Sequence, residues 1–264
     1  MIHFAHGNGF PALCYSQLLK ALQRRYECTY VDMIGHTSKY PVTENWDYLV
    51  DELIHNIQRE NALKKNNSPI IAVGHSLGGV LTLLAAHQKP ELFHRVVMID
   101  APVLNQIKSK IVRLAKSLGV IDNLTPARAA RRRRQYWKNQ DELYQYLKEK
   151  PLFNTFTEAC LQDFMRFGVE KKENGYQLRF DPQTEYLIYR TIPHHLPSYL
   201  KKLSVPVILI YGDQSTVVSR FDVLYMQQRY NIHCIKMKGS HMLPMESPEL
   251  LAEIIFKAVD KEVF

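Results

Sequence analysis

The chain has 264 residues, of which 46% are hydrophobic and 23% are charged, a composition typical of a globular protein with one sizeable core. Its longest apolar runs, such as Val205–Tyr211, have the length of a strand and not the roughly 20 residues that a membrane span needs. The net charge is +8, and residues 103–199 carry 17 Lys and Arg against 10 Asp and Glu, so one internal segment holds nearly all of the excess.

Short apolar runs alternate with amphipathic patterns along the chain. Six runs are predicted to be strands, at residues 2–5, 28–32, 70–73, 95–100, 207–211 and 233–237. Five stretches are predicted to be helices, at residues 11–25, 45–63, 77–88, 221–229 and 248–261. This alternation indicates an α/β fold with six parallel strands, in the spatial order 2-1-3-4-5-6, and helices on both faces.

Residues 103–197 interrupt the alternation. This stretch is predicted to be helical, is basic and rich in Tyr and Phe, and only Tyr176–Phe180 resembles a strand. Ligands bind at the carboxyl ends of strands in a doubly wound sheet, and an insertion between two strands is placed there. We therefore interpret residues 103–197 as a helical lid over a core made of residues 1–102 and 198–264.

A candidate nucleophile lies where the third predicted strand meets its helix. The sequence there is Gly74-His75-Ser76-Leu77-Gly78-Gly79, and a sharp strand-to-helix turn would hold Ser76 in a strained conformation with its Oγ exposed. Gly74 and Gly78 would leave room for the close approach of strand and helix. The alternative is a plain turn that needs glycines and has no catalytic role.

Two further loops are predicted to reach the same edge of the sheet. Gly239-Ser240-His241 follows the last strand, so His241 can accept the Ser76 proton and return it to the leaving group. His6-Gly7-Asn8-Gly9-Phe10 follows the first strand, and the backbone N–H of Asn8 can form an oxyanion hole with that of Leu77. We expect His6 to hold this loop in place.

The order of the motifs H-G-N-G-F-P, G-H-S-L-G-G, V-P-V-I-L-I-Y-G and G-S-H-x-x-P-x-E-x-P resembles the α/β-hydrolase superfamily, most closely its lidded esterases and lipase-like members. The resemblance implies a truncated six-stranded version of that fold, because Met1 directly precedes what resembles the third strand of the family. It also implies a serine hydrolase that cleaves a carboxylic ester through an acyl-enzyme. A serine at position 76 argues against dehalogenase and epoxide hydrolase chemistry, where the similar pattern has Asp.

The acid of the triad departs from the family pattern. Ser215 stands where the resemblance implies a carboxylate, three residues after Gly212. Asp100 ends the preceding strand, a position that some family members use, and its strand is expected to neighbour 207–211. We therefore expect Asp100 to orient His241, with Asp213 as the alternative acid. A third alternative is that neither carboxylate serves.

Other functions are open as well, and the missing acid at position 215 is the reason to consider one without catalysis. A thioesterase or a hydrolase of carbon–carbon bonds can use the same residues, and a non-catalytic small-molecule receptor can keep the fold. We expect no cofactor, because metal-ligand spacing is absent. The four scattered cysteines, Cys14, Cys28, Cys160 and Cys234, and the lack of a signal-peptide pattern in residues 1–13 favour a cytoplasmic protein.

The basic segment has several interpretations. Arg128 and Arg131–Arg134 precede Tyr136 and Trp137; they can form a solvated helix face, or attract an anionic acyl substrate or a membrane surface. We do not expect nucleic acid as a partner, because no nucleic-acid-binding fold is recognised. Four aromatic residues of this segment either pack its helices or line an acyl pocket, namely Phe153, Phe156, Phe164 and Phe167.

Overall fold

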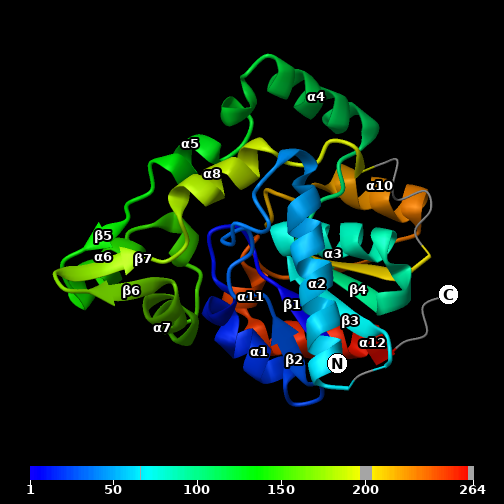
Figure 1. The fold of residues 1–264 in the computed structure, drawn as a ribbon, viewed down its shortest axis with the longest axis horizontal. Helices are drawn as coiled ribbons and strands as arrows, with labels where there is room; N and C mark the ends of the chain where they lie inside the picture. The colour runs from blue at the N-terminus through cyan, green and yellow to red at the C-terminus, as the bar shows by residue number, and fades with distance from the viewer. Residues whose placement is uncertain (66, 197–203, 261–264) are drawn as a thin grey trace.

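The computed structural model describes residues 1–65, 67–196 and 204–260. A six-stranded sheet crosses the body in the order β2-β1-β3-β4-β8-β9, and every neighbouring pair is parallel (Figure 1). The predicted strand order is thereby confirmed. The strands are β1 (Ile2–Ala5), β2 (Cys28–Tyr30), β3 (Ile70–His75), β4 (Phe93–Ile99), β8 (Val207–Gly212) and β9 (His233–Met237).

The register brings the carboxyl ends of neighbouring strands to one edge. Ala5 pairs with Gly74, His75 with Ile99 and Ile99 with Ile210. Gly212 likewise pairs with Met237 at the end of β9. The loops after β1, β3, β4, β8 and β9 therefore leave the sheet at one edge, and these are the loops that carry the candidate site.

Helices cover both faces of the sheet because the strands are apolar on both sides. Ile71 and Val73 point to the face of α1 (Ser16–Leu22) and α12 (Pro248–Asp260). Ile70 and Ala72 point to the opposite face, which three other helices cover. Those helices are α2 (Asp47–Leu63), α3 (Leu77–Gln88) and α10 (Arg220–Tyr230). The short α11 (Leu243–Glu246) precedes α12, whose predicted last residue, 261, lies outside the described residues.

Two predicted helices begin differently in the structure. The stretch expected at 11–25 divides into the 3-10 helix η1 (Ala12–Tyr15) and α1, and the stretch expected at 45–63 begins as the 3-10 helix η2 (Glu44–Trp46). Asn45 and Trp46 have left-handed φ angles of 61° and 64°. The indole of Trp46 donates to the Ile188 carbonyl at 3.0 Å, so a contact with the insertion overrides the helical periodicity.

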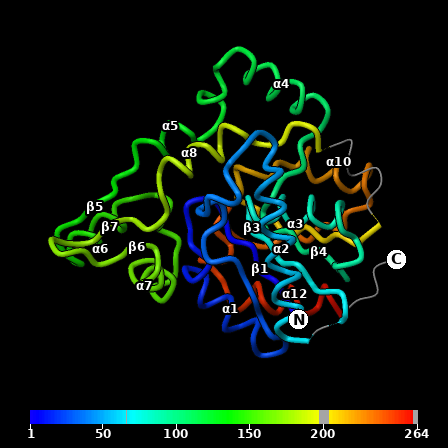
Figure 2. The backbone as a smooth tube through the Cα atoms, in the orientation of Figure 1, coloured from blue at the N-terminus to red at the C-terminus, as the bar shows by residue number. Residues whose placement is uncertain are grey.

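Between β4 and β8 the chain forms the insertion, which leaves the body and returns to it (Figure 2). Its helices are α4 (Gln106–Ser117), α5 (Ala127–Arg131), α6 (Gln140–Lys148), α7 (Glu158–Phe167) and α8 (Pro182–Arg190). The described residues contain three more 3-10 helices, η3 (Pro90–Leu92), η4 (Ile121–Asn123) and η5 (Pro151–Phe153). The expected boundary at residues 197 and 198 lies outside the described residues.

The insertion also contains a small antiparallel sheet. Its order is β5-β7-β6, made of β5 (Tyr136–Trp137), β6 (Val169–Lys172) and β7 (Gly175–Leu178). β7 confirms that the predicted stretch 176–180 forms a strand, but the strand begins one residue earlier and ends two residues earlier than predicted. The other two strands were not predicted. β6 exposes three of its four residues, so it lacks the apolar alternation that identifies a strand.

Candidate active site

Ser76 lies on the turn between β3 and α3 with a strained backbone, φ 52° and ψ −115°. Its N–H donates to the Ile99 carbonyl at 3.0 Å, which fixes the turn against β4. A Cβ atom on Gly74 would overlap the Gly78 carbonyl, and one on Gly78 would overlap the Ala5 carbonyl. Only glycine at these two positions lets β1, β3 and α3 approach closely enough to form the turn.

Asn8, Ser76 and Leu77 line one cavity of about 280 Å³. Its other walls are mainly apolar, with side chains that include Trp46, Val80, Leu104, Leu124, Ile188 and Ile192. None of the described residues that line it is charged. The Asn8 side chain donates to the Glu185 carbonyl at 3.0 Å, so the loop after β1 is attached to α8.

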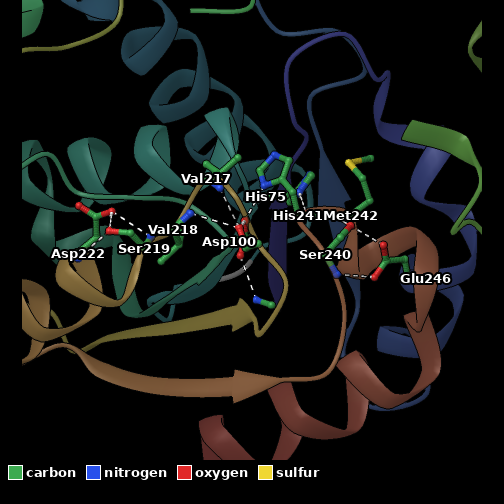
Figure 3. A network of polar contacts seen from close by, with 12 residues as sticks. His75, Asp100, Val217, Val218, Ser219, Asp222, Ser240, His241, Met242 and Glu246 are labelled. Carbon is green, nitrogen blue, oxygen red and sulfur yellow. Dashed lines mark hydrogen bonds and ion pairs between the residues drawn. The ribbon is translucent and has the colours of Figure 1, made fainter. Parts of the chain in front are cut away.

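His241 contacts a buried carboxylate on the neighbouring strand end. Its Nδ1 lies 2.6 Å from Oδ2 of Asp100, which is fully buried and has a positive φ of 45° (Figure 3). The other carboxylate oxygen, Oδ1, accepts a hydrogen bond from the Gly212 N–H at 3.0 Å. Since a carboxylate only accepts, His241 carries its proton on Nδ1 and leaves Nε2 free of that contact.

Ser215 stands at the position where the family resemblance implied a carboxylate, and it also contacts Asp100. Its hydroxyl donates to Asp100 Oδ2 at 2.6 Å and accepts from the N–H groups of Val217 and Val218 at 3.1 and 3.2 Å. Ser215 thus supplies a hydrogen bond to the carboxylate that faces His241.

Asp213 has a different position. Its Oδ1 accepts from the Gly239 N–H at 3.0 Å, and its own N–H donates to the Met237 carbonyl at 2.8 Å. Asp213, directly after β8, is therefore hydrogen-bonded to the turn that precedes His241, and it is Asp100 that contacts the imidazole. Glu246 holds the same loop through Ser240, whose N–H donates to it at 2.8 Å (Figure 3).

Tyr15 and His75 connect the loop after β1 to the loop that carries His241. No local sequence pattern predicted this connection. The Gly7 N–H donates to the Tyr15 hydroxyl at 3.0 Å, and that hydroxyl lies 2.8 Å from His75 Nδ1. His75 Nε2 lies 2.9 Å from the His241 carbonyl oxygen. Burial and, next, the nearby His241 hold the pKa of His75 well below its usual range. A neutral His75 then accepts from Tyr15 and donates to the His241 carbonyl.

His6 fastens the loop after β1, the role that we expected for it. Its Nδ1 donates to the Gly7 carbonyl at 2.8 Å, and its Nε2 accepts from the Ile34 N–H at 2.8 Å. Burial lowers the pKa of His6 to about 4. The neutral imidazole uses both ring nitrogens, and protonation of Nε2 would break the bond from Ile34.

One expected contact is not formed. Among the residues that the structure describes, no hydrogen bond joins His241 to Ser76. The ring of His75, the residue before Ser76, lies 4.8 Å from the ring of His241. Catalytic hydrogen bonds are often long in a free enzyme and tighten when substrate binds. The arrangement thus supplies a strained serine at a cavity and an oriented imidazole on the neighbouring loop.

The arginines of the basic segment are largely occupied inside the insertion. Arg133 pairs with Glu185 at 2.9 Å, and its guanidinium lies over Phe10 and Phe164. Arg134 pairs with Glu142 at 2.5 Å, and Arg131 lies over the ring of Tyr186. None of these arginines is among the residues that line the cavity.

The aromatic residues of the insertion pack against the body. The Phe10 ring lies 6.1, 6.3 and 5.5 Å from the rings of Phe153, Phe156 and Phe164. Phe167 joins the same apolar cluster. This cluster attaches α7 to the loop after β1, and its rings are not among the residues that line the cavity.

The described part of the chain holds neither a metal-binding cluster nor a membrane-spanning helix. In residues 1–65, 67–196 and 204–260, no three His, Cys, Asp or Glu side chains gather as a metal site. None of the helices in this part of the chain combines the length and the apolar character that crossing a membrane requires.

The alpha/beta hydrolase family matches residues 4–254 of the chain, and the chain belongs to that family. A Bacillus subtilis protein named as the uncharacterized hydrolase YugF is 25% identical over 95% of this chain and 86% of its own length. Two solved structures have the same fold. An E-2-(acetamidomethylene)succinate hydrolase has a TM-score of 0.75 at 20% identity, covering 99% of this chain and 91% of its own. A thioesterase domain from the curacin biosynthetic pathway has a TM-score of 0.71 at 16% identity, covering 97% and 90%.

Proposed function

We propose that this α/β hydrolase cleaves a neutral carboxylic ester, with Ser76 as nucleophile, His241 as general base and Asp100 as the acid that orients it. The observation that carries the proposal is the strained Ser76 at the end of β3, lining an apolar cavity, together with a histidine whose Nδ1 contacts a buried carboxylate and whose ring lies 4.8 Å from that of His75, the residue before Ser76. Strained backbone of this kind is kept where a side chain must be presented for reaction.

The reaction proceeds in two halves. Ser76 Oγ attacks the ester carbonyl carbon while His241 Nε2 takes the Ser76 proton, and the oxyanion is held by the N–H groups of Asn8 and Leu77. The bond to the alcohol oxygen then breaks, and His241 protonates that oxygen. A water molecule attacks the acyl-enzyme, gives its proton to His241, and the acid leaves as Ser76 regains a proton.

The cavity supports a neutral substrate of modest size. Its lining carries no charge in the described residues, and its volume of about 280 Å³ is at the small end of ligand pockets. An anionic acyl group would lose its hydration there without a partner. We therefore expect short uncharged acyl chains to be the best substrates.

A thioester is the second candidate, because the same serine, histidine and oxyanion hole act on it. The structural similarity to a thioesterase domain shows a shared fold and leaves this choice to experiment. Carbon–carbon hydrolysis uses the same residues on a different bond. A receptor without turnover is the non-enzymatic alternative.

Labelling by a fluorophosphonate tests the nucleophile directly. We expect the intact chain to be labelled, Ser76→Ala to be unlabelled, and the exposed Ser38→Ala to be labelled like the original chain. If the original chain is folded but is not labelled, this result would contradict the proposed enzyme and favour a receptor without turnover. A panel of p-nitrophenyl esters and acyl thioesters of matched length then identifies which bond is cleaved. Faster cleavage of the thioesters would overturn the proposal that the substrate is an ester.

A further inference from the structure

The outer face of α4 is apolar and exposed. Four side chains spaced by four, three and four residues form one stripe, with exposed fractions of 71% for Ile107, 50% for Ile111, 59% for Leu114 and 66% for Leu118. Residues at this spacing lie on one side of a helix. Scattered surface leucines are normal, but a continuous stripe of this kind marks an interaction site.

The opposite face holds α4 to the rest of the protein. Val112 and Ala115 pack with Ile121 in a small core of their own, and Lys108 binds both carboxylate oxygens of the buried Asp222 at 2.7 and 2.8 Å. In Figure 1, α4 forms the outer edge of the insertion, away from the central sheet. The stripe therefore faces outward on a helix whose position is fixed by other contacts.

The charges around the stripe are positive. α4 carries Lys108, Lys110, Arg113 and Lys116 and no acidic residue, but Lys108 and Lys116 are paired with Asp222 and Glu44. Lys110 and Arg113 are exposed, and the rotation of about 100° per residue places Lys110 directly beside the stripe and Arg113 farther round the same side of the helix. Arg128 and Arg132 of the following segment are exposed as well. Between residues 104 and 131 the only acidic residue is Asp122, which pairs with Arg190 at 3.1 Å.

We propose that this face docks on an anionic lipid surface. An apolar stripe bordered by Lys and Arg is the pattern of a helix that lies in the plane of a membrane interface, with its apolar side chains among the acyl chains and its cations at the headgroups. A second copy of the chain fits less well. A two-fold contact would place this face against itself and bring two basic helices together.

The docked orientation has a consequence for the cavity. Leu124 is 58% exposed, follows α4 in the chain and lines the cavity beside Leu104. The segment that follows the stripe along the chain therefore reaches the cavity. Docking does not rest on the proposed ester hydrolysis, because it depends on α4 and not on Ser76.

Co-sedimentation of the full chain with vesicles tests the proposal. We expect binding to phosphatidylcholine vesicles that contain phosphatidylglycerol and little binding to phosphatidylcholine alone. Ile111→Ser with Leu114→Ser should weaken binding by at least about tenfold. Lys110→Gln with Arg113→Gln should weaken it by about tenfold, and added salt should remove that difference.

Matched controls separate this face from the rest of the surface. Leu63 is 70% exposed at the end of α2, so Leu63→Ser should bind like the original chain, as should Lys20→Gln with Lys89→Gln. Circular dichroism checks that each variant is folded. Ser76→Ala should bind vesicles unchanged, which keeps this test independent of catalysis. Unweakened binding by the Ile111/Leu114 variant would overturn the proposal. The proposal would also be overturned if the original chain did not bind vesicles but formed a dimer in sedimentation velocity that the Ile111/Leu114 variant no longer formed.

Discussion

Two residues of the candidate site, Ser76 and Asp100, have left-handed backbone with φ angles of 52° and 45°. Such conformations cost about 1–3 kcal/mol each and persist only where neighbours enforce them. Each residue directly follows a strand and is bonded to the neighbouring strand, since the Ser76 N–H donates to the Ile99 carbonyl and the Asp100 N–H donates to the Ile210 carbonyl at 2.8 Å. The sheet therefore stabilises the strained conformations from which both side chains enter the site.

Asp100→Asn should lower kcat by about four orders of magnitude on a p-nitrophenyl ester, because the amide no longer fixes the His241 tautomer or stabilises the imidazolium. Asp213→Asn should lower it far less, since Asp213 holds the turn at Gly239. Both variants are assayed on one ester at one pH, with circular dichroism as the check on folding. The opposite ranking would show that Asp213 is the acid.

Tyr15→Phe should lower both stability and kcat. The Gly7 N–H and His75 Nδ1 would both lose their hydrogen-bond partner in a buried site, which costs about 1–3 kcal/mol per unsatisfied group. Urea unfolding measures the first effect and ester turnover the second. Tyr40→Phe is the matched control, because Tyr40 makes a similar contact with His55 at the surface. Equal losses in the two variants would contradict a role of Tyr15 in the site.

At the scale of elements, the loop after β1 should make stability depend on pH through His6. The pKa of His6 falls to about 4 in the folded protein, against about 6.5 in the unfolded chain. Between these values the unfolded chain binds the proton and the folded protein does not, so the free energy of unfolding falls as pH falls below 6.5. The full effect is about 3 kcal/mol.

Urea unfolding from pH 7 to pH 4 measures this slope. His6→Gln should flatten it, and the exposed His94→Gln should leave it as in the original chain. His3 is also buried, with a pKa lowered to about 4, so part of the slope should remain in His6→Gln. A slope unchanged in that variant would contradict the assignment.

Much of this architecture could be predicted from the sequence because its signals are local. The six strands and their order follow from alternating apolar runs, and the turn at Ser76 follows from glycines on both sides of it. The proximity of Asp100 to His241 follows from strand order, since β4 and β8 are neighbours.

Other features could not be predicted, because they depend on contacts between distant residues. β6 is polar on its surface and becomes a strand only by pairing with β7. Tyr15 and His75 are 60 residues apart and share no motif. Trp46 leaves the helical pattern because its indole reaches Ile188, 142 residues later.

At the scale of the whole molecule, the excess of positive charge should have little effect on turnover of soluble substrates. Arg133 and Arg134 are paired with Glu185 and Glu142, and the cavity lining is uncharged in the described residues. We expect kcat/KM for a neutral ester and for an anionic ester of the same length to respond equally to added salt, with the neutral ester the better substrate. A selective fall for the anionic ester would show that the insertion attracts it.

The position of the insertion affects how the chain is made. β4 pairs with β8, but residues 100–206 lie between them, and at about 5–20 residues per second their synthesis takes about 5–20 s. During that interval the growing chain presents an unpaired apolar edge at β4, which in the finished protein is buried at every residue except His94. An open edge of this kind is a template for wrong pairing with other chains. Nascent chains that end within the insertion should therefore aggregate unless a chaperone covers β4.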